Sequence, residues 1–247
     1  MTNKKETLKI VTWNCKGKFI ERFEKFEENK EFEADVYVIQ ECLNPTQSDC
    51  KNEKFKDFSK GALWSDSPID TRFGLGLGIF GKNIKNNNWE RKDQDLGHCI
   101  SFNVDGKINL LGIWGRWYGH GCVADRLYDY LKNADKLDSD YIIVGDMNID
   151  AKYPTQSPEC KKQTGTVFKF LNEDKKLVSA YHTYFQEDHA KETKETFYFR
   201  KNKDKGTSHI DYVFVNKNTK IINVKLGDES WLNDSDHVPL FVEIELP

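Results

Sequence analysis

The sequence predicts an α/β fold, a single domain in which a sandwich of mixed β-sheets is flanked by helices. A strand, an amphipathic helix and a second strand follow one another over residues 8–39, and such β-α-β units join parallel strands by a right-handed crossover. Apolar runs with short connections between residues 73 and 114 indicate antiparallel neighbours, and most of the C-terminal third also has the pattern of strands. The 247 residues fit one large domain or two small ones, and the lack of a Pro-, Gly- or Ser-rich linker favours a single domain.

The N-terminal elements follow from their apolar spacing. Residues 8–13 form an apolar run that is typical of a strand. Phe19, Phe23 and Phe26 then recur at i, i+4 and i+7 among Glu and Lys, which predicts an amphipathic helix. The strands expected next in order cover residues 36–39, 73–80, 100–104 and 109–114.

The C-terminal half alternates helices and strands before it becomes mostly strand. A helix is expected over residues 123–137, with Val123, Leu127, Leu131 and Ala134 on one face. The β-branched run at 141–144, bounded by Gly, is typical of a strand buried on both faces. A third helix is expected over residues 166–175. The remaining strands are expected at residues 176–180, 196–199, 210–215, 220–226 and 240–246.

Composition excludes some classes of protein. The chain has 37 basic and 40 acidic residues, a formal net charge of −3, which argues against a surface that coats nucleic acid but leaves room for a local basic strip. No apolar run approaches the roughly 20 residues of a membrane span, and the N-terminus lacks a signal-peptide core. None of the six cysteines forms a C-x-x-C pair. We therefore expect a cytoplasmic protein with reduced thiols, no membrane association and, by default, a monomer.

Polar side chains follow the ends of several predicted strands. These groups are Trp13-Asn14, Gln40-Glu41, Gly145-Asp146-Met147-Asn148, Ser208-His209-Ile210-Asp211 and, before the last strand, Ser235-Asp236-His237-Val238-Pro239. Each alone is an ordinary turn or strand cap, because Asp and Asn favour turns. Together they would converge if the strands share one sheet edge, where open α/β sheets place their ligands. Their oxygen atoms suit Mg²⁺ or Mn²⁺, and a His beside a carboxylate suits proton transfer or electrostatic stabilisation.

These motifs, in this order from Ile10 to Pro239, resemble the endonuclease/exonuclease/phosphatase superfamily, which includes pancreatic-type deoxyribonucleases and apurinic/apyrimidinic endonucleases. The resemblance implies a four-layered α/β/β/α sandwich with its active site at one rim. It implies a divalent-metal-dependent phosphodiesterase, first of all a nuclease acting on DNA or RNA. A phosphatase or phosphodiesterase for a small-molecule, nucleotide or phospholipid substrate is the alternative. A catalytically inactive interaction module is disfavoured, because the metal, water-activating and His positions hold suitable residues.

The resemblance also implies a metal site for Mg²⁺ or Mn²⁺. Glu41 would be the main ligand, and Asn14 and Asp236 would lie in or next to the coordination shell. The metal would neutralise charge that develops on phosphate oxygens.

Four further residues would carry out the chemistry. Asp146 would orient or deprotonate the attacking water, and Asn148 would hold the phosphate. His237 would stabilise the pentacovalent transition state, while Asp211 would fix its ring and raise its basicity.

The middle strand departs from the family pattern. Members usually carry Tyr or His at its end as a phosphate donor, whereas the matching position here is Trp114, whose indole N–H donates but cannot shuttle protons. Arg116, Tyr118 or His120 could take that place and, with Trp114, are candidate substrate-binding residues.

Two more candidates for substrate binding belong to the basic run at residues 200–205, Arg-Lys-Asn-Lys-Asp-Lys, and to the segment just after it. They are Arg200, within the run, and His209, just after it. A solvated hairpin tip is the plainer interpretation of such a run, but its place beside a predicted phosphodiester site also favours contact with phosphate.

Two weaker signals are set aside. Residues 76–81 match G-x-G-x-x-G, but no helix start follows, so the dinucleotide-binding interpretation fails. His182 and His189 lie seven residues apart, which does not suit two ligands on one helical turn, so surface or supporting roles are favoured over zinc.

Overall fold

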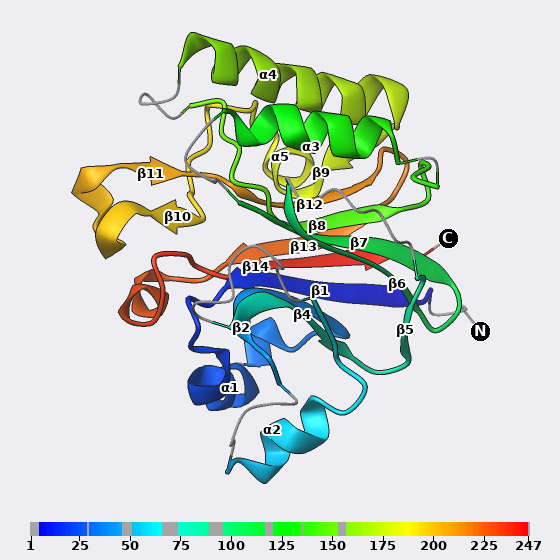
Figure 1. Ribbon diagram of the computed structural model, residues 1–247, viewed down its shortest axis with the longest axis vertical. Helices are drawn as coiled ribbons and strands as arrows, with labels where there is room; N and C mark the ends of the chain where they lie inside the picture. Colours follow the sequence, from blue (N-terminus) through cyan, green and yellow to red (C-terminus); the bar gives the residue numbers. More distant parts are fainter. Residues whose placement is uncertain are drawn as a thin grey trace.

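The computed structural model describes residues 5–28, 30–45, 51–65, 74–88, 96–116, 121–134, 136–152 and 157–246. Within them, two six-stranded β-sheets pack face to face and helices cover both outer sides (Figure 1). Both sheets mix parallel and antiparallel neighbours. The predicted four-layered α/β/β/α sandwich is confirmed.

The first sheet has the strand order β13-β14-β1-β2-β4-β3. Its central strands β1 and β2 are parallel, as the β-α-β unit predicts, and β14 and β4 flank them in antiparallel pairing. The strands are β1 (Thr7–Asn14), β2 (Val36–Leu43), β3 (Leu63–Ser65), β4 (Leu75–Gly81), β13 (Ile221–Leu226) and β14 (Leu240–Glu245).

The second sheet has the order β5-β6-β7-β8-β12-β9. Its parallel pair is β7 and β8, and β12 runs antiparallel to β8. The strands are β5 (Ile84–Asn86), β6 (Gly97–Val104), β7 (Ile108–Gly115), β8 (Ile142–Asp146), β9 (Leu177–Ser179) and β12 (Asp211–Asn216). A separate hairpin pairs β10 (Phe197–Tyr198) with β11 (Thr207–Ser208).

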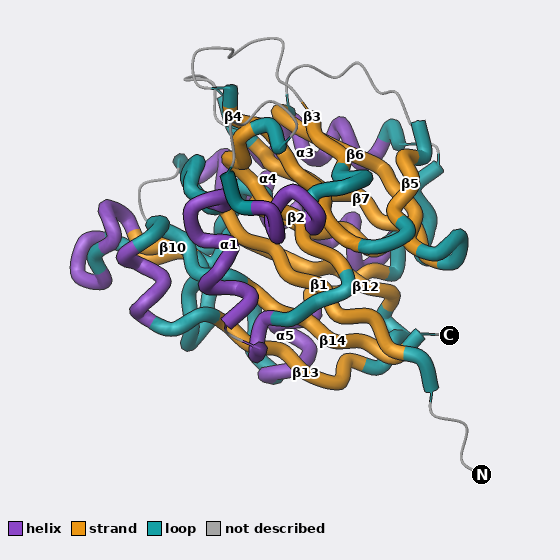
Figure 2. Tube along the Cα trace, turned by 90° about the horizontal axis from the view of Figure 1, so that it is seen from below, coloured by secondary structure: helices purple, strands orange, loops and turns teal. Residues whose placement is uncertain are grey.

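Helices form the outer layers. The helix α1 (Phe19–Glu28) lies across the outer face of the first sheet near α2 (Glu53–Phe58), as Figure 2 shows for α1. On the far side, α3 (Val123–Lys132) and α4 (Pro158–Lys169) cover the second sheet (Figure 1). The short α5 (Ala180–Phe185) contacts β12 and β13 and closes one edge of the sandwich.

Three apolar clusters hold these layers together. Aliphatic side chains such as Val38, Leu77 and Val144 fill the space between the sheets. An aromatic cluster under α1 includes Phe19 and Trp231, and a third cluster lies under α3 and α4. Burial of this apolar surface, at roughly 25 cal/mol per Å², stabilises the two sheets and fixes the positions of their rims.

Several predicted boundaries are wrong at short or capped elements. The third helix begins at Pro158, not 166, because Ser157 caps it by accepting a hydrogen bond from the Cys160 N–H and Pro stands in its first turn. It continues as a single π-helical turn at Phe170–Asp174. The second helix ends at Lys132 rather than 137. The helices α2 and α5 and the strands β3, β5 and β11 were not predicted from the sequence. Phe73, the expected start of β4, lies outside the described residues.

A disulfide joins Cys122 to Cys160, with 5.5 Å between their Cα atoms. It links the N-cap of α3 to the first turn of α4. The expectation of reduced thiols is therefore wrong for this pair, because the fold brings together two cysteines that are 38 residues apart in the chain. Cys15 and Cys42 are buried thiols. Every helix among the described residues is too short or too polar to cross a bilayer.

Candidate active site

The polar strand ends meet at one rim of the sandwich. In the first sheet Asn14, at the end of β1, pairs in register with Gln40 of β2. In the second sheet Asp146, at the end of β8, lies opposite Asp211, the first residue of β12. A hydrogen bond from Asn14 Nδ2 to Asp146 Oδ2, 3.0 Å long, joins the rims of the two sheets. The convergence predicted from sequence is therefore observed for these residues.

Asn14 is the link between two carboxylates. Its Nδ2 also lies 3.2 Å from Glu41 Oε1, so one amide group contacts both Glu41 and Asp146. The Ser235 hydroxyl donates to the Asn14 carbonyl oxygen at 2.7 Å, and the Lys16 N–H donates to Asn14 Oδ1 at 3.2 Å. The buried Asn14 side chain is thereby held in a single orientation.

Glu41 reaches the rim because β2 is irregular beside it. The pairing of β2 with β4 shifts register between Ile39 and Cys42, and Glu41 has φ of +50°. Such a bulge changes the direction of a side chain. A left-handed conformation at a non-glycine residue costs free energy, and residues in this conformation cluster at functional sites. The Gly17 N–H donates to the Glu41 carbonyl oxygen at 2.8 Å and holds this conformation.

Asp146 is buried and accepts hydrogen bonds from three groups. Besides Asn14, the Asn148 N–H donates to Oδ1 at 3.0 Å and Asn148 Nδ2 donates to Oδ2 at 3.2 Å. Asn148 has φ of +50°, and its Nδ2 also donates to the Gly115 carbonyl oxygen at 2.7 Å. Burial and then the Asp211 carboxylate raise the pKa of Asp146 to about 7, although His237 and Asn14 oppose that shift. Such a carboxylate is poised to accept a proton near neutral pH.

Asp211 and His237 form a buried pair beside it. His237 Nδ1 donates to Asp211 Oδ2 at 2.9 Å, and the Ser235 hydroxyl accepts from the His237 N–H at 3.1 Å. Burial disfavours the charged ring, but the Asp211 carboxylate outweighs it and raises the pKa of His237 to about 9. The Thr196 hydroxyl accepts from the Asp211 N–H at 3.1 Å and fixes the start of β12.

Charge balance explains how two carboxylates coexist here without water. One ligand atom from each of Asp146, Asp211 and His237 lies within 4.8 Å of the others, and all three side chains are buried. Like charges directly opposite in a sheet are destabilising. The imidazolium of His237 offsets part of this repulsion.

The donor set next to the trio fits a hard divalent cation. Glu41 and Asp236 offer carboxylate oxygens, both side chains are only partly buried, and Asn14 offers an amide oxygen. Mg²⁺ and Mn²⁺ are bound by a few such oxygens and keep several waters. Lys16 Nζ lies 2.6 Å from Asp236 Oδ2 and neutralises that carboxylate. The sequence analysis missed Lys16, for which the only signal was a basic residue two positions after Asn14.

The substrate-binding candidates at the middle strand are only partly described. Trp114 lies opposite Asp146 in the register of β7 and β8, but it is buried, and its ring stacks on His98 with centroids 4.8 Å apart. The Arg116 guanidinium lies over the Trp114 ring, 4.7 Å from its centroid. Tyr118 and His120 lie outside the described residues.

The two candidates near the basic run differ in outcome. Arg200 is exposed, with φ of +55°, in the 3₁₀ turn Phe199–Lys201 at the tip of the β10–β11 hairpin. His209 is fully buried, its Nδ1 lies 3.2 Å from the Lys194 carbonyl oxygen, and its ring packs against Tyr181. Its prediction as a substrate contact is therefore corrected: β12 starts two residues later, and the ring points into the protein.

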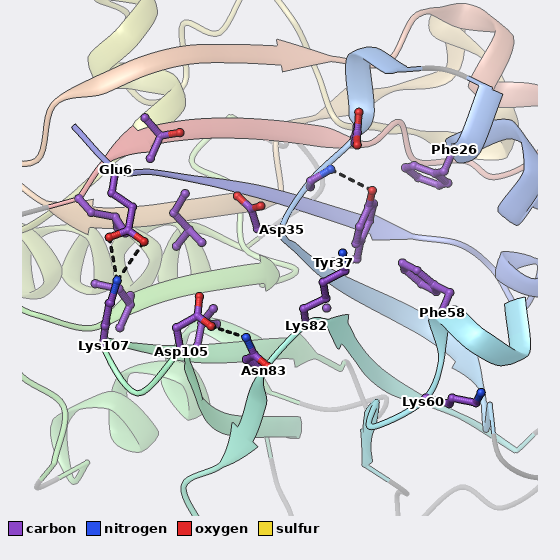
Figure 3. Close-up of a pocket in the computed structure, with 18 of the residues that line it drawn as sticks. Glu6, Phe26, Asp35, Tyr37, Phe58, Lys60, Lys82, Asn83, Asp105 and Lys107 are labelled. Atoms are coloured by element: carbon purple, nitrogen blue, oxygen red, sulfur yellow. Dashed lines mark hydrogen bonds and ion pairs between the residues drawn. The ribbon is translucent and has the colours of Figure 1, made fainter. Parts of the chain in front are cut away.

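A cavity of about 900 Å³ lies at the opposite rim, between the starts of β1 and β2 and the end of β4 (Figure 3). Glu6 and Lys107 form an ion pair in its wall at 2.8 Å, and Asn83 donates to Asp105. Glu6 and Asp105 are thus paired with donors, and the cavity lies apart from the candidate active site.

No protein-family model and no curated protein matches this sequence. Solved structures do match its fold. The AP endonuclease LMAP from Leishmania major superposes with a TM-score of 0.67 at 15% identity, over 98% of this chain and 88% of that one. A D. rerio TDP2 humanized by 14 mutations superposes with a TM-score of 0.65 at 14% identity, over 97% of this chain and 99% of that one. These two matches confirm the fold that the sequence resemblance predicts.

Proposed function

We propose that this protein is a divalent-metal-dependent phosphodiesterase that hydrolyses phosphodiester bonds of nucleic acid. The observation that carries the proposal is the joining of two groups at one rim: the carboxylates around Asn14 and the buried pair of Asp211 and His237. Phosphodiester hydrolysis needs a cation for the phosphate, a base for water and a donor for developing negative charge. This rim offers a candidate for each.

Glu41 would hold the cation, with Asn14 and Asp236 beside it. The oxygen donors favour Mg²⁺ or Mn²⁺, which would supply Lewis-acid stabilisation of phosphate oxygens when bound. Lys16, which pairs with Asp236 at 2.6 Å, would add a second positive charge at the edge of the site. That charge is available to a phosphate because the Lys16 side chain is about half exposed.

Asp146 would orient the attacking water and accept its proton. Hydrogen bonds from Asn14 and Asn148 fix the carboxylate, and its pKa of about 7 suits a base at neutral pH. Asn148 would also contact the phosphate, because hydrogen bonds to Asp146 and to the Gly115 carbonyl oxygen hold its amide group beside the base.

His237 would donate a hydrogen bond to phosphate oxygens as negative charge develops. Asp211 holds Nδ1, so the other ring nitrogen, Nε2, is the atom left for substrate. Because the pair is buried and fixed before substrate arrives, little reorganisation is needed in the transition state.

Nucleic acid is favoured over a small phosphate ester by the hairpin beside the rim. The Tyr198 N–H of β10 donates to the Asp236 carbonyl oxygen at 2.7 Å, which ties the exposed basic residues Arg200 and Lys201 to the candidate metal site. Basic side chains next to the candidate metal site can bind the phosphates on either side of the scissile bond. A fold shared with an AP endonuclease agrees with DNA as the substrate.

The test is hydrolysis of labelled DNA, with and without an abasic site, of RNA and of p-nitrophenyl phosphate, in Mg²⁺ and in EDTA. We expect Mg²⁺-dependent cleavage of nucleic acid that falls by at least about 10³-fold in Asp146→Asn. Asp105→Asn, at the opposite rim, is the matched control and should be as active as wild type. Equal rates in EDTA, or an Asp146→Asn variant as active as the control, would refute the proposal. Cleavage of p-nitrophenyl phosphate alone would point to a small ester instead.

A further inference from the structure

A second cluster of potential ligands lies behind β12, apart from the rim. One ligand atom each of His182, His189 and Glu192 lies within 4.8 Å of the other two. His182 Nε2 is 3.0 Å from Glu192 Oε1, and the rings of His182 and His189 have centroids 3.8 Å apart. Although a spacing of seven residues does not suit two ligands on one helical turn, the chain leaves α5 at Gln186 in a left-handed conformation and brings the His189 ring against that of His182.

Within the described part of the chain, the residues of this cluster and the neighbouring His209 carry buried polar atoms that lack a partner. Among the described residues, His189 Nδ1 and Glu192 Oε2 are shielded from solvent and lack a hydrogen-bond partner, and so does Nε2 of the neighbouring His209. The Glu192 side chain is almost completely buried. An unsatisfied buried polar atom costs about 1–3 kcal/mol, and a carboxylate costs more. A simple hydrogen bond between His182 and Glu192 would leave these atoms unsatisfied.

We propose that His182, His189 and Glu192 bind a Zn²⁺ ion. Two imidazoles and one carboxylate form a ligand set that zinc takes in proteins, with a water in the fourth position. Tetrahedral ligands at zinc distances lie roughly 3.3 Å apart, close to the 3.0 Å between His182 Nε2 and Glu192 Oε1. His189, whose ring stacks on Phe168, would supply the third ligand.

The surroundings supply the supports that metal ligands need. Ser179 Oγ lies 2.8 Å from His182 Nδ1, which leaves Nε2 with its lone pair toward Glu192 when Nδ1 carries the proton. The Ala190 N–H donates to Glu192 Oε1 at 2.9 Å. Zinc-bound imidazoles and carboxylates are held in this way, and such supports tune affinity by 10- to 100-fold. These hydrogen bonds to His182 and Glu192 distinguish the cluster from polar residues that merely lie near one another.

The zinc site would fasten the segment that leads to the rim. Four residues after Glu192, the Thr196 hydroxyl accepts from the N–H of Asp211, and the Thr196 carbonyl oxygen accepts from the N–H of Val238 at 2.9 Å. The ion would thus hold the backbone on either side of the Asp211–His237 pair. Its role is structural, and it stands whether or not the rim hydrolyses phosphodiesters.

The experiment is a Co²⁺ titration of untagged, chelator-treated protein carrying Glu41→Gln, which disables the rim cation site. Four-coordinate Co²⁺ with imidazole ligands absorbs strongly in the visible, whereas six-coordinate Co²⁺ with oxygen ligands absorbs weakly. We expect one equivalent of strongly absorbing Co²⁺ that Zn²⁺ displaces. Adding Glu192→Gln should weaken binding at least about tenfold, and adding His189→Phe should abolish it. Glu195→Gln, a buried acid paired with Lys152, is the matched control and should bind normally.

Weak absorption, or strong absorption that survives both His189→Phe and Glu192→Gln, would overturn the zinc site. Circular dichroism would verify that these variants fold. Should either fail to fold, the zinc site is tested in the Glu41→Gln protein alone. One equivalent of Zn²⁺ should raise the melting temperature of that protein and remain bound through dialysis. An unchanged melting temperature with no retained zinc would overturn the proposal.

Discussion

The Nδ1 atom of His237 lies 2.9 Å from Oδ2 of Asp211, although the two residues are 26 positions apart and both side chains are buried. The contact depends on β12, which begins at Asp211, and on an isolated bridge between Phe197 and His237 that holds the segment before β14. Because neither residue can be solvated, each depends on the other for its charge. The pair should therefore act as one unit in catalysis.

The first prediction follows from that unit. In the nuclease assay, His237→Ala should lose about 10²- to 10³-fold in kcat with little change in KM, because the contact strengthens as transition-state charge develops. Asp211→Asn should fall in the same direction, and the double variant should be barely worse than His237→Ala. Steady-state kinetics and melting temperatures of all three would be measured. Additive losses, or losses that vanish on cooling below the melting transition, would reject the paired role.

The second prediction concerns the metal. Glu41→Gln keeps the shape of the side chain and its contact with Asn14, so the fold should persist, but a neutral amide binds a hard cation poorly. Activity should fall by orders of magnitude and should not return at saturating Mg²⁺. Glu21→Gln, an exposed acid on α1 that pairs with Lys18, is the control. If Glu41→Gln matched that control in saturating Mg²⁺, Glu41 would not be the main ligand.

The third prediction tests Thr196, which the sequence analysis did not single out. Its buried hydroxyl accepts from the N–H groups of Ile210 and Asp211, both at 3.1 Å. Thr196→Val would leave both donors unsatisfied, so the free energy of unfolding should fall by about 2–4 kcal/mol. Thr196→Ser keeps the hydroxyl and should lose only about 1 kcal/mol for the methyl group. Urea denaturation would measure both; equal losses in the two variants would show that packing, not the hydroxyl, matters.

Much of the fold could be predicted because its central strands are continuous apolar runs and therefore carry a strong local pattern. The run ending in Asp146 and Asn148 is an example, since burial on both faces leaves little else for such a sequence. The elements that were missed are short: α2 and α5 have six residues each, too few for apolar periodicity to show.

The site was harder to predict wherever it depends on partners distant in sequence. Strand ends located Asn14 and Asp146, but no local pattern shows that one amide joins Glu41 to Asp146, because that contact spans both sheets. His209 shows the opposite error, since its place beside Asp211 in sequence gave it a substrate role, whereas the turn into β12 points its ring into the protein. The spacing of residues in the sequence predicts local geometry only, whereas the packing of distant strands determines which side chains come into contact.

The fourth prediction concerns the disulfide between Cys122 and Cys160. It closes a loop of 38 residues between α3 and α4, and the chain-entropy estimate for such a loop is about 4 kcal/mol of stabilisation. The double variant Cys122→Ser/Cys160→Ser should therefore unfold at lower urea concentration, and dithiothreitol should destabilise wild type by a similar amount. Dithiothreitol should not affect the double variant. Equal stability of wild type in its oxidised and reduced forms would contradict a stabilising bond.

The fifth prediction concerns acid stability of the metal-free protein. Burial and the neighbouring His182 lower the pKa of His189 to about 3, and burial lowers the pKa of His209 to about 4. In the unfolded chain a histidine titrates near 6.5. Above that pH both rings are neutral in either state, so their contribution to stability is fully present. As the pH falls below about 6.5, these two histidines bind protons in the unfolded chain but stay neutral in the folded protein, so the free energy of unfolding decreases.

Urea denaturation in EDTA between pH 7.5 and 5 would measure this decrease. Each ring that stays neutral contributes a slope of at most about 1.4 kcal/mol per pH unit below its unfolded pKa. Phe keeps the stacking on Phe168, so His189→Phe should fold and should reduce the slope by up to that amount. Replacing His98, which is buried on β6 away from this cluster, with Phe would control for the loss of a histidine elsewhere. If His189→Phe keeps the full wild-type slope, protonation of His189 does not limit acid stability.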